Sequence, residues 1–167
     1  VGTVSIDVRA TDLAGAFVEY SFDIVVANTN DAPTVLNAIA NQAATEDTAF
    51  GFQFASNTFA DVDTGDSLTY TASGVPAWLT FNAAARTFSG TPANADVGTH
   101  TLTVRATDSS GAFVEDQFDI VVANTNDVPS AGNNVYSINE DALLNVPVGG
   151  ILLDDIDVDG DALTAVL

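Results

Sequence analysis

Alternation of apolar and polar residues is the main pattern of the chain, and it predicts β-strands. In Thr99–Ala106 the side chains of Leu102 and Val104 share one apolar face, and Phe118–Val122 alternates in the same way. No stretch shows a convincing helical period. Further strands are expected at Val4–Ala10, Phe22–Val26, Ala49–Phe54, Leu68–Thr71, Trp78–Phe81 and Thr87–Phe88.

Turn residues separate these strands. Gly, Pro, Asn and Asp recur about every 8–12 residues, a spacing typical of two-sheet sandwiches. The pattern therefore predicts an all-β fold made of antiparallel Greek-key β-sandwiches, with about seven strands in each module.

One long motif occurs twice. Val1–Pro33 returns as Val97–Pro129, 96 positions later, with 24 of 33 residues identical. A near-copy at a fixed long period indicates a tandem array of small modules. We therefore expect a C-terminal remnant of one module at residues 1–30, a complete module at 31–126, and the N-terminal part of a further module at 127–167.

The joints between these modules are short. They lie at Asn28–Pro33 and Asn124–Pro129, each directly after an expected strand. Proline ends a strand ladder because it lacks an amide hydrogen, and it restricts the residue before it. Neighbouring modules are therefore expected to lie almost in contact.

Charge excludes several classes of partner. The net charge is −20, from 23 acidic residues against three arginines and no lysine. Nothing on such a chain neutralises phosphate, so we expect no nucleic acid partner, and no apolar run is long enough for direct membrane insertion. The absence of cysteine excludes a disulfide framework. Either the acids form a solvated surface, or they hold cations.

The spacing of the carboxylates favours cations. Asp61 and Asp63 follow the linker acid Asp31 by 30 and 32 positions, and Asp157 and Asp159 follow Asp127 by the same counts. Acids at alternate positions of an extended loop point the same way and repel each other unless a cation lies between them. Calcium prefers such oxygen ligands, whereas one histidine and no cysteine leave few ligands for zinc or copper. A simple hydrophilic turn is the alternative.

These motifs resemble a known family. Val104–Asp108, followed by Ile120–Pro129, resembles the end of a cadherin repeat, with its Ala-x-Asp and Asp-x-Asn-Asp elements. Pro76–Phe81 with Thr87–Pro92 is similar to dystroglycan-type cadherin-like, or Putative Ig, modules of large bacterial surface proteins. Asp157–Ala165 resembles the tandem cadherin-like repeats of long adhesins exported by type I secretion. The resemblance covers essentially the whole chain and implies a cadherin/Ig-like sandwich.

The resemblance also implies a set of calcium ligands between modules. At the first joint it implies Asn28, Asn30, Asp31, Asp61, Asp63 and Asp108. At the second joint it implies Glu46, Asn124, Asn126, Asp127, Asp157 and Asp159. By the same correspondence, Asp12 would serve a joint before Val1 and Glu140 a joint after Leu167.

The chain departs from the cadherin pattern at several ligands. Asn28 and Asn124 replace the first linker acid, and the Asp-Arg-Glu element is missing, with only Asp96 near its place. Fewer charged ligands imply one or two Ca²⁺ ions per joint, with a dissociation constant around 10⁻⁴–10⁻³ M.

We expect no enzyme. His100 is replaced by Val4 in the other copy of the motif, and Ser109 by Leu13, so neither residue is a credible catalytic group. No acid–base pair, nucleophile–histidine pair or phosphate loop has the spacing that catalysis requires.

The sequence and the resemblance together predict a calcium-binding spacer or adhesion segment of a large repetitive protein, extracellular and on a bacterial cell surface. Calcium between modules would stiffen the array. The expected partners are neighbouring repeats of the same chain, with surface glycans and other copies of the chain as further candidates. Two alternatives remain: a carbohydrate-binding module of a secreted protein, and a subunit of a strand-complemented extracellular filament.

Overall fold

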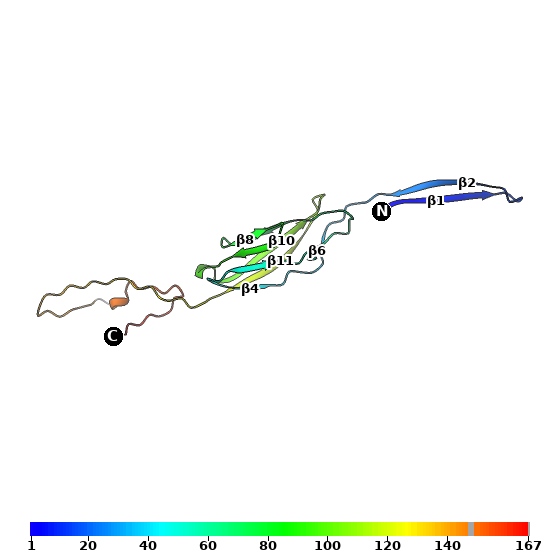
Figure 1. Cartoon of the computed structure of the whole chain (residues 1–167). Coiled ribbons are helices and arrows are strands. Elements are labelled where there is room, and N and C mark those ends of the chain that lie inside the picture. The colour runs from blue at the N-terminus through cyan, green and yellow to red at the C-terminus, as the bar shows by residue number, and fades with distance from the viewer. Residues whose placement is uncertain (147–148, 167) are drawn as a thin grey trace.

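The structure, a computed structural model, describes residues 1–146 and 149–166. It shows three parts in a row (Figure 1): a β-hairpin, a central sandwich and a C-terminal segment with little regular structure. The hairpin and the C-terminal segment lie at opposite ends of an elongated molecule. Within the described ranges, no helix is long and apolar enough to cross a membrane.

The central sandwich consists of two main sheets. The first has the strand order β4 (Gln42–Thr45), β11 (Phe113–Ala123), β10 (Gly98–Thr107) and β7 (Thr69–Ser73). The second has the order β5 (Phe50–Gln53), β9 (Thr87–Gly90) and β8 (Leu79–Asn82). A small additional pair joins β3 (Thr34–Val35) to β6 (Phe59–Ala60). The expected all-β sandwich is confirmed.

Two details differ from the expectation. The part of the chain that the structure describes between residues 31 and 126 contains nine strands, β3 to β11, because the two-residue strands β3 and β6 form a separate pair beside the seven strands of the main sheets. One strand pair, β4 with β11, is parallel rather than antiparallel. The chain enters this sandwich at one end and leaves it at the other (Figure 1), so its early strand β4 and its last strand β11 run in the same direction.

The core lies between the two sheets. Leu102 and Val104 of β10 are fully buried, as their alternation predicts. Phe118 of β11 stacks edge-on against Phe88 of β9, with ring centroids 5.7 Å apart. Phe88 also stacks on Phe81 of β8, at 4.6 Å. The Phe118–Phe88 contact joins the two sheets, whereas Phe88 and Phe81 are partners within the second sheet.

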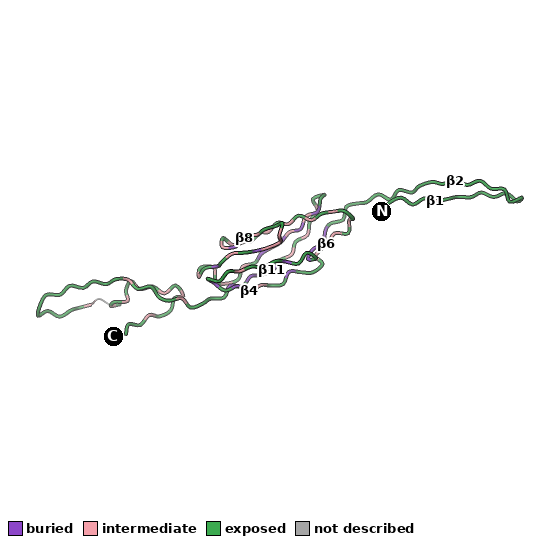
Figure 2. The backbone as a smooth tube through the Cα atoms, viewed as in Figure 1, coloured by how far each residue is buried: buried purple, intermediate pink, exposed green. Residues whose placement is uncertain are grey.

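The hairpin and the C-terminal segment have no such core. β1 (Gly2–Thr11) and β2 (Phe17–Val26) pair along their whole length, but no second sheet covers them in the described structure, and almost all of their residues are exposed (Figure 2). The C-terminal segment is held by an isolated bridge between Ser130 and Ile156, and it contains the short turn η2 (Gly150–Leu152).

Candidate metal sites at the two joints

The first joint gathers its acids around one aspartate. Asp63 accepts hydrogen bonds from the Asn28 side-chain amide at Oδ1 (2.8 Å) and from the backbone amide of Asp31 at Oδ2 (2.7 Å). The backbone amide of Asp63 in turn donates to Asp61 Oδ1 at 2.8 Å. The structure therefore brings the linker and the Asp-x-Asp pair together, although they are some thirty positions apart in the sequence.

Asp108 joins the same site from the turn after β10. Its Oδ2 accepts the Asn30 side-chain amide at 3.0 Å, and its Oδ1 accepts the backbone amides of Ser110 and Ala112 at 2.9 and 2.8 Å. The Asn30 amide lowers the pKa of Asp108, burial opposes this, and the amides of the turn lower the pKa further. Asp108 is therefore held as a carboxylate, although its side chain is only 5% exposed.

Sequence reasoning missed one acid at this joint. Asp66 lies with Asp61 and Asp63, and one carboxylate oxygen from each lies within 4.8 Å of the others. Ser109 donates a hydrogen bond to Asp66, which fixes it beside the Asp108 turn. Its position three residues after Asp63 was the available signal, and Asp161 follows Asp159 at a similar distance.

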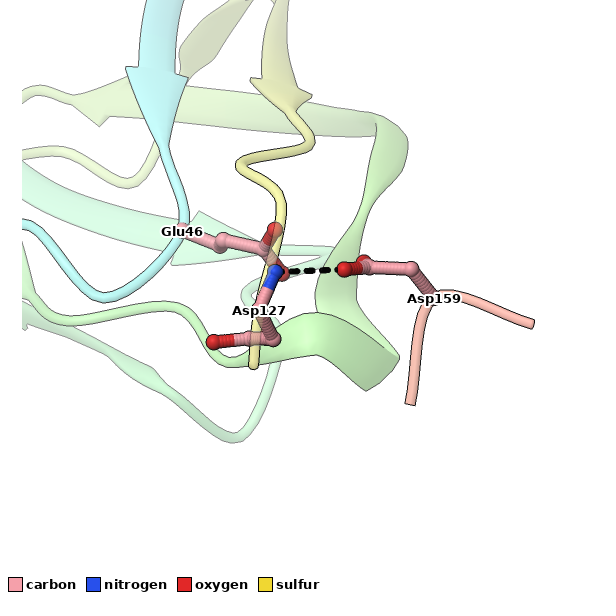
Figure 3. Close-up of side chains that lie close together, drawn as sticks. All are labelled: Glu46, Asp127 and Asp159. Carbon is pink, nitrogen blue, oxygen red and sulfur yellow. Dashed lines mark hydrogen bonds between the residues drawn. The ribbon is translucent and has the colours of Figure 1, made fainter. Parts of the chain in front are cut away.

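The second joint repeats the arrangement. Asp159 accepts the Asn124 side-chain amide at Oδ1 (2.9 Å) and the backbone amide of Asp127 at Oδ2 (2.6 Å; Figure 3). The backbone amide of Asp159 donates to Asp157 Oδ1 at 3.0 Å. These bonds correspond to those of Asp63 with Asn28, Asp31 and Asp61 at the first joint, so the same linker geometry forms twice.

Glu46 adds a buried acid to the second joint. It lies just after β4, is 1% exposed, and accepts the backbone amide of Thr125. One carboxylate oxygen each from Glu46, Asp127 and Asp159 lies within 4.8 Å of the others, and Figure 3 shows the three side chains together. The pKa of Asp127 is raised, first by burial and then by the negative charges of Asp47, Asp159, Glu46 and Asp157.

Asn126 and Asn94 complete the description of the second joint. Asn126 donates to the carbonyl of its neighbour Asp127 at 3.0 Å, and the structure gives it no bond to the acids Glu46 or Asp159. Sequence reasoning missed Asn94 of the turn η1 (Asn94–Asp96), whose amide donates to Asp159 Oδ1 at 2.9 Å. No motif pointed to Asn94, because only the fold brings η1 to this joint.

Each joint holds one buried carboxylate oxygen without a hydrogen-bond donor. Within the described residues, Glu46 Oε2 and Asp61 Oδ2 are buried without a hydrogen-bond partner. A buried carboxylate oxygen without a donor is costly unless a cation neutralises it. Each joint therefore contains one such oxygen beside further carboxylates, a donor set made only of oxygen that fits a hard divalent cation such as Ca²⁺.

Comparison with known proteins agrees with this architecture. A family model described as "Putative Ig domain" matches residues 32–123, which is more than half of the chain. The chain belongs to this family. The expected relationship to bacterial cadherin/Ig-like repeats is confirmed by this match together with the bacterial adhesin and the cadherin structures described next.

This Ig-like chain is also similar to a bacterial adhesin and to cadherin structures. It is 45% identical over 49 residues to the "Serine-rich adhesin for platelets" of Staphylococcus aureus, a match that spans 29% of the chain but 4% of that protein. Its structure is similar to that of the extracellular cadherin domains 1–4 of protocadherin gamma B7, with a TM-score of 0.59 and 20% identity.

The coverage of these structures is partial. The protocadherin match spans 87% of this chain and 38% of that one, and it shows the fold alone. An endo-fucoidan hydrolase of glycoside hydrolase family 107 matches 74% of this chain and 19% of its own, with a TM-score of 0.46 and 24% identity. This second likeness is too distant to carry an argument about activity.

Proposed function

We propose that this Ig-like chain is a calcium-binding spacer or adhesion segment of a large extracellular protein of the bacterial surface. Its relatedness to a stretch of a bacterial adhesin and its cadherin-type fold support this proposal. In this role, ions at the joints stiffen the array by fixing how each module is oriented on the next, and the chain performs no chemistry of its own.

The mechanism is electrostatic and mechanical. Without a cation, Glu46, Asp127 and Asp159 repel one another, and this repulsion favours any movement that separates the C-terminal segment from the sandwich. A divalent cation between these carboxylates attracts each of them, so the net interaction changes from repulsion to attraction. Because Glu46 belongs to the sandwich and Asp159 to the C-terminal segment, an ion bound to both ties the two parts together.

The burial of the Glu46 carboxylate, with no neutralising partner, is the main support for this proposal. A carboxylate that is 1% exposed, with one oxygen lacking a donor and two further carboxylates within 4.8 Å, has no cationic side chain to neutralise it in the described structure. The three arginines do not supply the charge. Arg9 and Arg105 pair with Glu19 and Glu115 on the strands, and Arg86 forms no ion pair within the described residues. The joint therefore needs a cation from solution.

The test compares the chain with and without calcium. Adding Ca²⁺ in the millimolar range to EDTA-treated protein should raise its melting temperature, and small-angle scattering should show a narrower range of end-to-end distances. Magnesium should act more weakly, because it demands a stricter octahedral geometry and gives up its water reluctantly. If Ca²⁺ changes neither the melting temperature nor the scattering, the proposal is wrong.

The carbohydrate-binding alternative gains little support from the only tryptophan. Trp78 is half-buried and packs its ring against Phe50 and His100, with centroids 5.9 and 6.0 Å away. Sugar-binding platforms present an aromatic face to solvent, whereas this ring belongs to the edge of the core.

A further inference from the structure

A groove on the central sandwich lies between the start of β7 and the turn that joins β8 to β9. Its volume is about 450 Å³, and its lining residues are Leu68, Thr69, Tyr70, Ala83, Ala84 and Arg86. All six lie within residues 32–123, the part of the chain that the family model matches and in which both main sheets are present. The groove is therefore a feature of the module itself, and its lining includes none of the candidate metal ligands of the described joints.

Arg86 is the one cationic residue of this groove. The other two arginines of the chain, Arg9 and Arg105, pair with Glu19 and Glu115. Within the described residues Arg86 forms no ion pair, and its Nε is buried without a hydrogen-bond acceptor. A buried donor without an acceptor costs stability, so a ligand that supplies an acceptor here is favoured. In a chain with 23 acidic residues, an arginine that pairs with none of them is available to an anion from outside.

The backbone at Arg86 shows that the fold alone does not require arginine there. Arg86 ends the β8–β9 turn at a φ of +58°, a left-handed conformation that favours glycine. The Ala85 amide donates to Asn82 Oδ1 at 3.0 Å, and the Arg86 amide donates to the Ala83 carbonyl at 3.3 Å, which closes the turn. Glycine would adopt this turn without strain, so the arginine side chain is retained at a local cost.

The rest of the lining suits a sugar ring. Tyr70 is held in place by Phe54 and Phe59, whose ring centroids lie 5.4 and 5.9 Å away. With its apolar neighbours it offers a surface on which the C–H groups of a sugar can pack. The Thr69 hydroxyl donates to the Thr107 carbonyl at 3.2 Å, so its oxygen can still accept a hydrogen bond from a sugar hydroxyl.

We propose that this groove binds a sugar that carries one carboxylate, such as a uronic acid at the end of a glycan. The planar guanidinium of Arg86 donates two parallel hydrogen bonds to the carboxylate oxygens. The ring packs beside Tyr70, and one of its hydroxyls reaches Thr69. A volume of about 450 Å³ is within the range of small-molecule sites. The site is separate from Trp78, which does not line this groove.

The charge of the whole chain restricts the ligand further. A net charge of −20 repels a polyanion, and this repulsion acts over about 10 Å at ordinary salt concentrations. One carboxylate meets the attraction of Arg86 at contact distance, whereas every further negative charge of a polyanion meets the acids of the chain. The ligand is therefore a single acidic sugar on an otherwise neutral glycan.

Two matched sugars test the proposal. Methyl β-glucuronide and methyl β-glucoside share one ring and differ in whether they carry a carboxylate. In calcium-free buffer, an NMR titration with the glucuronide should shift the amide signals of residues 68–70 and 83–86 and reach saturation. The glucoside should bind at least about tenfold more weakly, because it cannot pair with Arg86. Equal binding of the two sugars, or no shift in this groove, overturns the proposal.

Substitutions at Arg86 assign the binding to its side chain. Arg86→Gly removes the guanidinium and suits the left-handed backbone, so it should keep the melting temperature and lose at least about tenfold in glucuronide affinity. Arg86→Lys keeps the charge without the planar donors and should bind with intermediate affinity. Arg105→Gln is the matched control, because it removes the same charge from the Glu115 pair, and it should bind like the parent. If Arg86→Gly also binds like the parent, the proposal is wrong.

A carboxylate on a peptide is the alternative ligand. N-acetylglutamate amide carries one carboxylate and no sugar ring, so it serves as the probe for this case. Weaker binding than that of the glucuronide supports the sugar, whereas equal or tighter binding makes the groove a site for acidic peptides and overturns the proposal. All of these titrations exclude calcium. Their failure would therefore leave the proposed role of Ca²⁺ at the joints untouched, and a chain that binds no calcium could still bind the glucuronide.

Discussion

At the scale of single residues, Glu46 is the most buried acid of the described structure, and few hydrogen-bond donors compensate its negative charge. Its Oε1 accepts one backbone amide, whereas its Oε2 is buried without a donor in the described structure. The carboxylates of Asp127 and Asp159 lie beside it, and negative charges held this close repel one another. Under the proposed function, an ion bound at the second joint would remove this repulsion.

Replacing Glu46 by glutamine should separate these two effects. The amide keeps the shape and can still accept the Thr125 amide, but it removes one negative ligand. Calcium affinity at the second joint should fall about 10-fold or more, while the calcium-free chain should be as stable as the parent or more stable. Isothermal titration calorimetry and thermal melts in EDTA measure the two quantities.

Glu115→Gln is the control for this substitution. Glu115 pairs with Arg105 near the start of β11, whereas the second joint follows the end of this strand, and the Glu115 side chain is 45% exposed. Calcium binding by this variant should match the parent. If both variants bind calcium equally well, Glu46 is not a ligand.

The pKa values of Asp127 and Asp108 predict opposite responses to pH. The pKa of Asp127 is raised by burial and by its acidic neighbours, so the folded chain binds its proton at a higher pH than the unfolded chain does. In EDTA, this group therefore adds stability as the pH falls through its folded pKa. The pKa of Asp108 is lowered, so its contribution is present above the ordinary value of 3.8 and is lost on further acidification.

Carboxyl NMR titration of the folded chain tests this contrast. In EDTA, Asp127 should titrate above pH 3.8 and Asp108 below it. Calcium should shift the Asp127 titration to lower pH, because the ion competes with the proton for the same oxygens. An Asp127 titration that calcium does not move would argue against its role as a ligand.

At the scale of strands and turns, the sequence predicts the long strands well and the short ones poorly. β10 and β11 alternate over ten or more residues and were recognised, although β11 begins at Phe113, earlier than expected. β3 and β6 have two residues each and carry no periodicity. β4 reads Gln-Ala-Ala-Thr, a weak strand sequence whose pairing comes from its place beside β11.

The same distinction applies to the joints. Asp63 and Asp159 were found because their spacing from the linker repeats in the two copies. Asn94 was not found, because the turn η1 reaches Asp159 only through the fold of the sandwich. Repetition in the sequence therefore located the joint residues that each module supplies in register, and missed those that tertiary packing adds.

At this scale, Gly90 lies close to the backbone and ring of Trp78, the residue before β8. Gly90 of β9 lies against Trp78, where an added Cβ would come within 2.0 Å of the Trp78 carbonyl oxygen and 3.1 Å of its ring. Gly90→Ala should therefore lower the free energy of unfolding by about 1–3 kcal/mol, since backbone must move. Gly51→Ala is the matched control, because a Cβ there meets nothing within 4 Å. Urea unfolding followed by Trp78 fluorescence compares the two variants.

At the scale of the whole molecule, the net negative charge acts on how far the parts of the chain separate. A chain with a net charge of −20 repels itself, and this repulsion favours extended, separated parts. At the first joint, Asp63 and Asp108 of the sandwich accept hydrogen bonds from Asn28 and Asn30 of the preceding part. At the second joint, carboxylates of successive parts lie together, since Glu46, Asp127 and Asp159 each bring an oxygen within 4.8 Å of the others. Under the proposed function, the rigidity of the chain would depend on a cation that neutralises these two joints.

Ordinary salt and calcium should affect this balance differently. Monovalent salt at about 0.1 M screens charges separated by more than about 10 Å, but it acts little on partly buried acids in contact. Raising the NaCl concentration should therefore reduce the general repulsion while leaving the joints flexible. A few millimolar Ca²⁺ should narrow the scattering-derived distribution of end-to-end distances far more than NaCl does at equal ionic strength, because the ion links carboxylates directly. If the two salts give the same curve at matched ionic strength, simple screening explains the behaviour and the joints hold no specific ion.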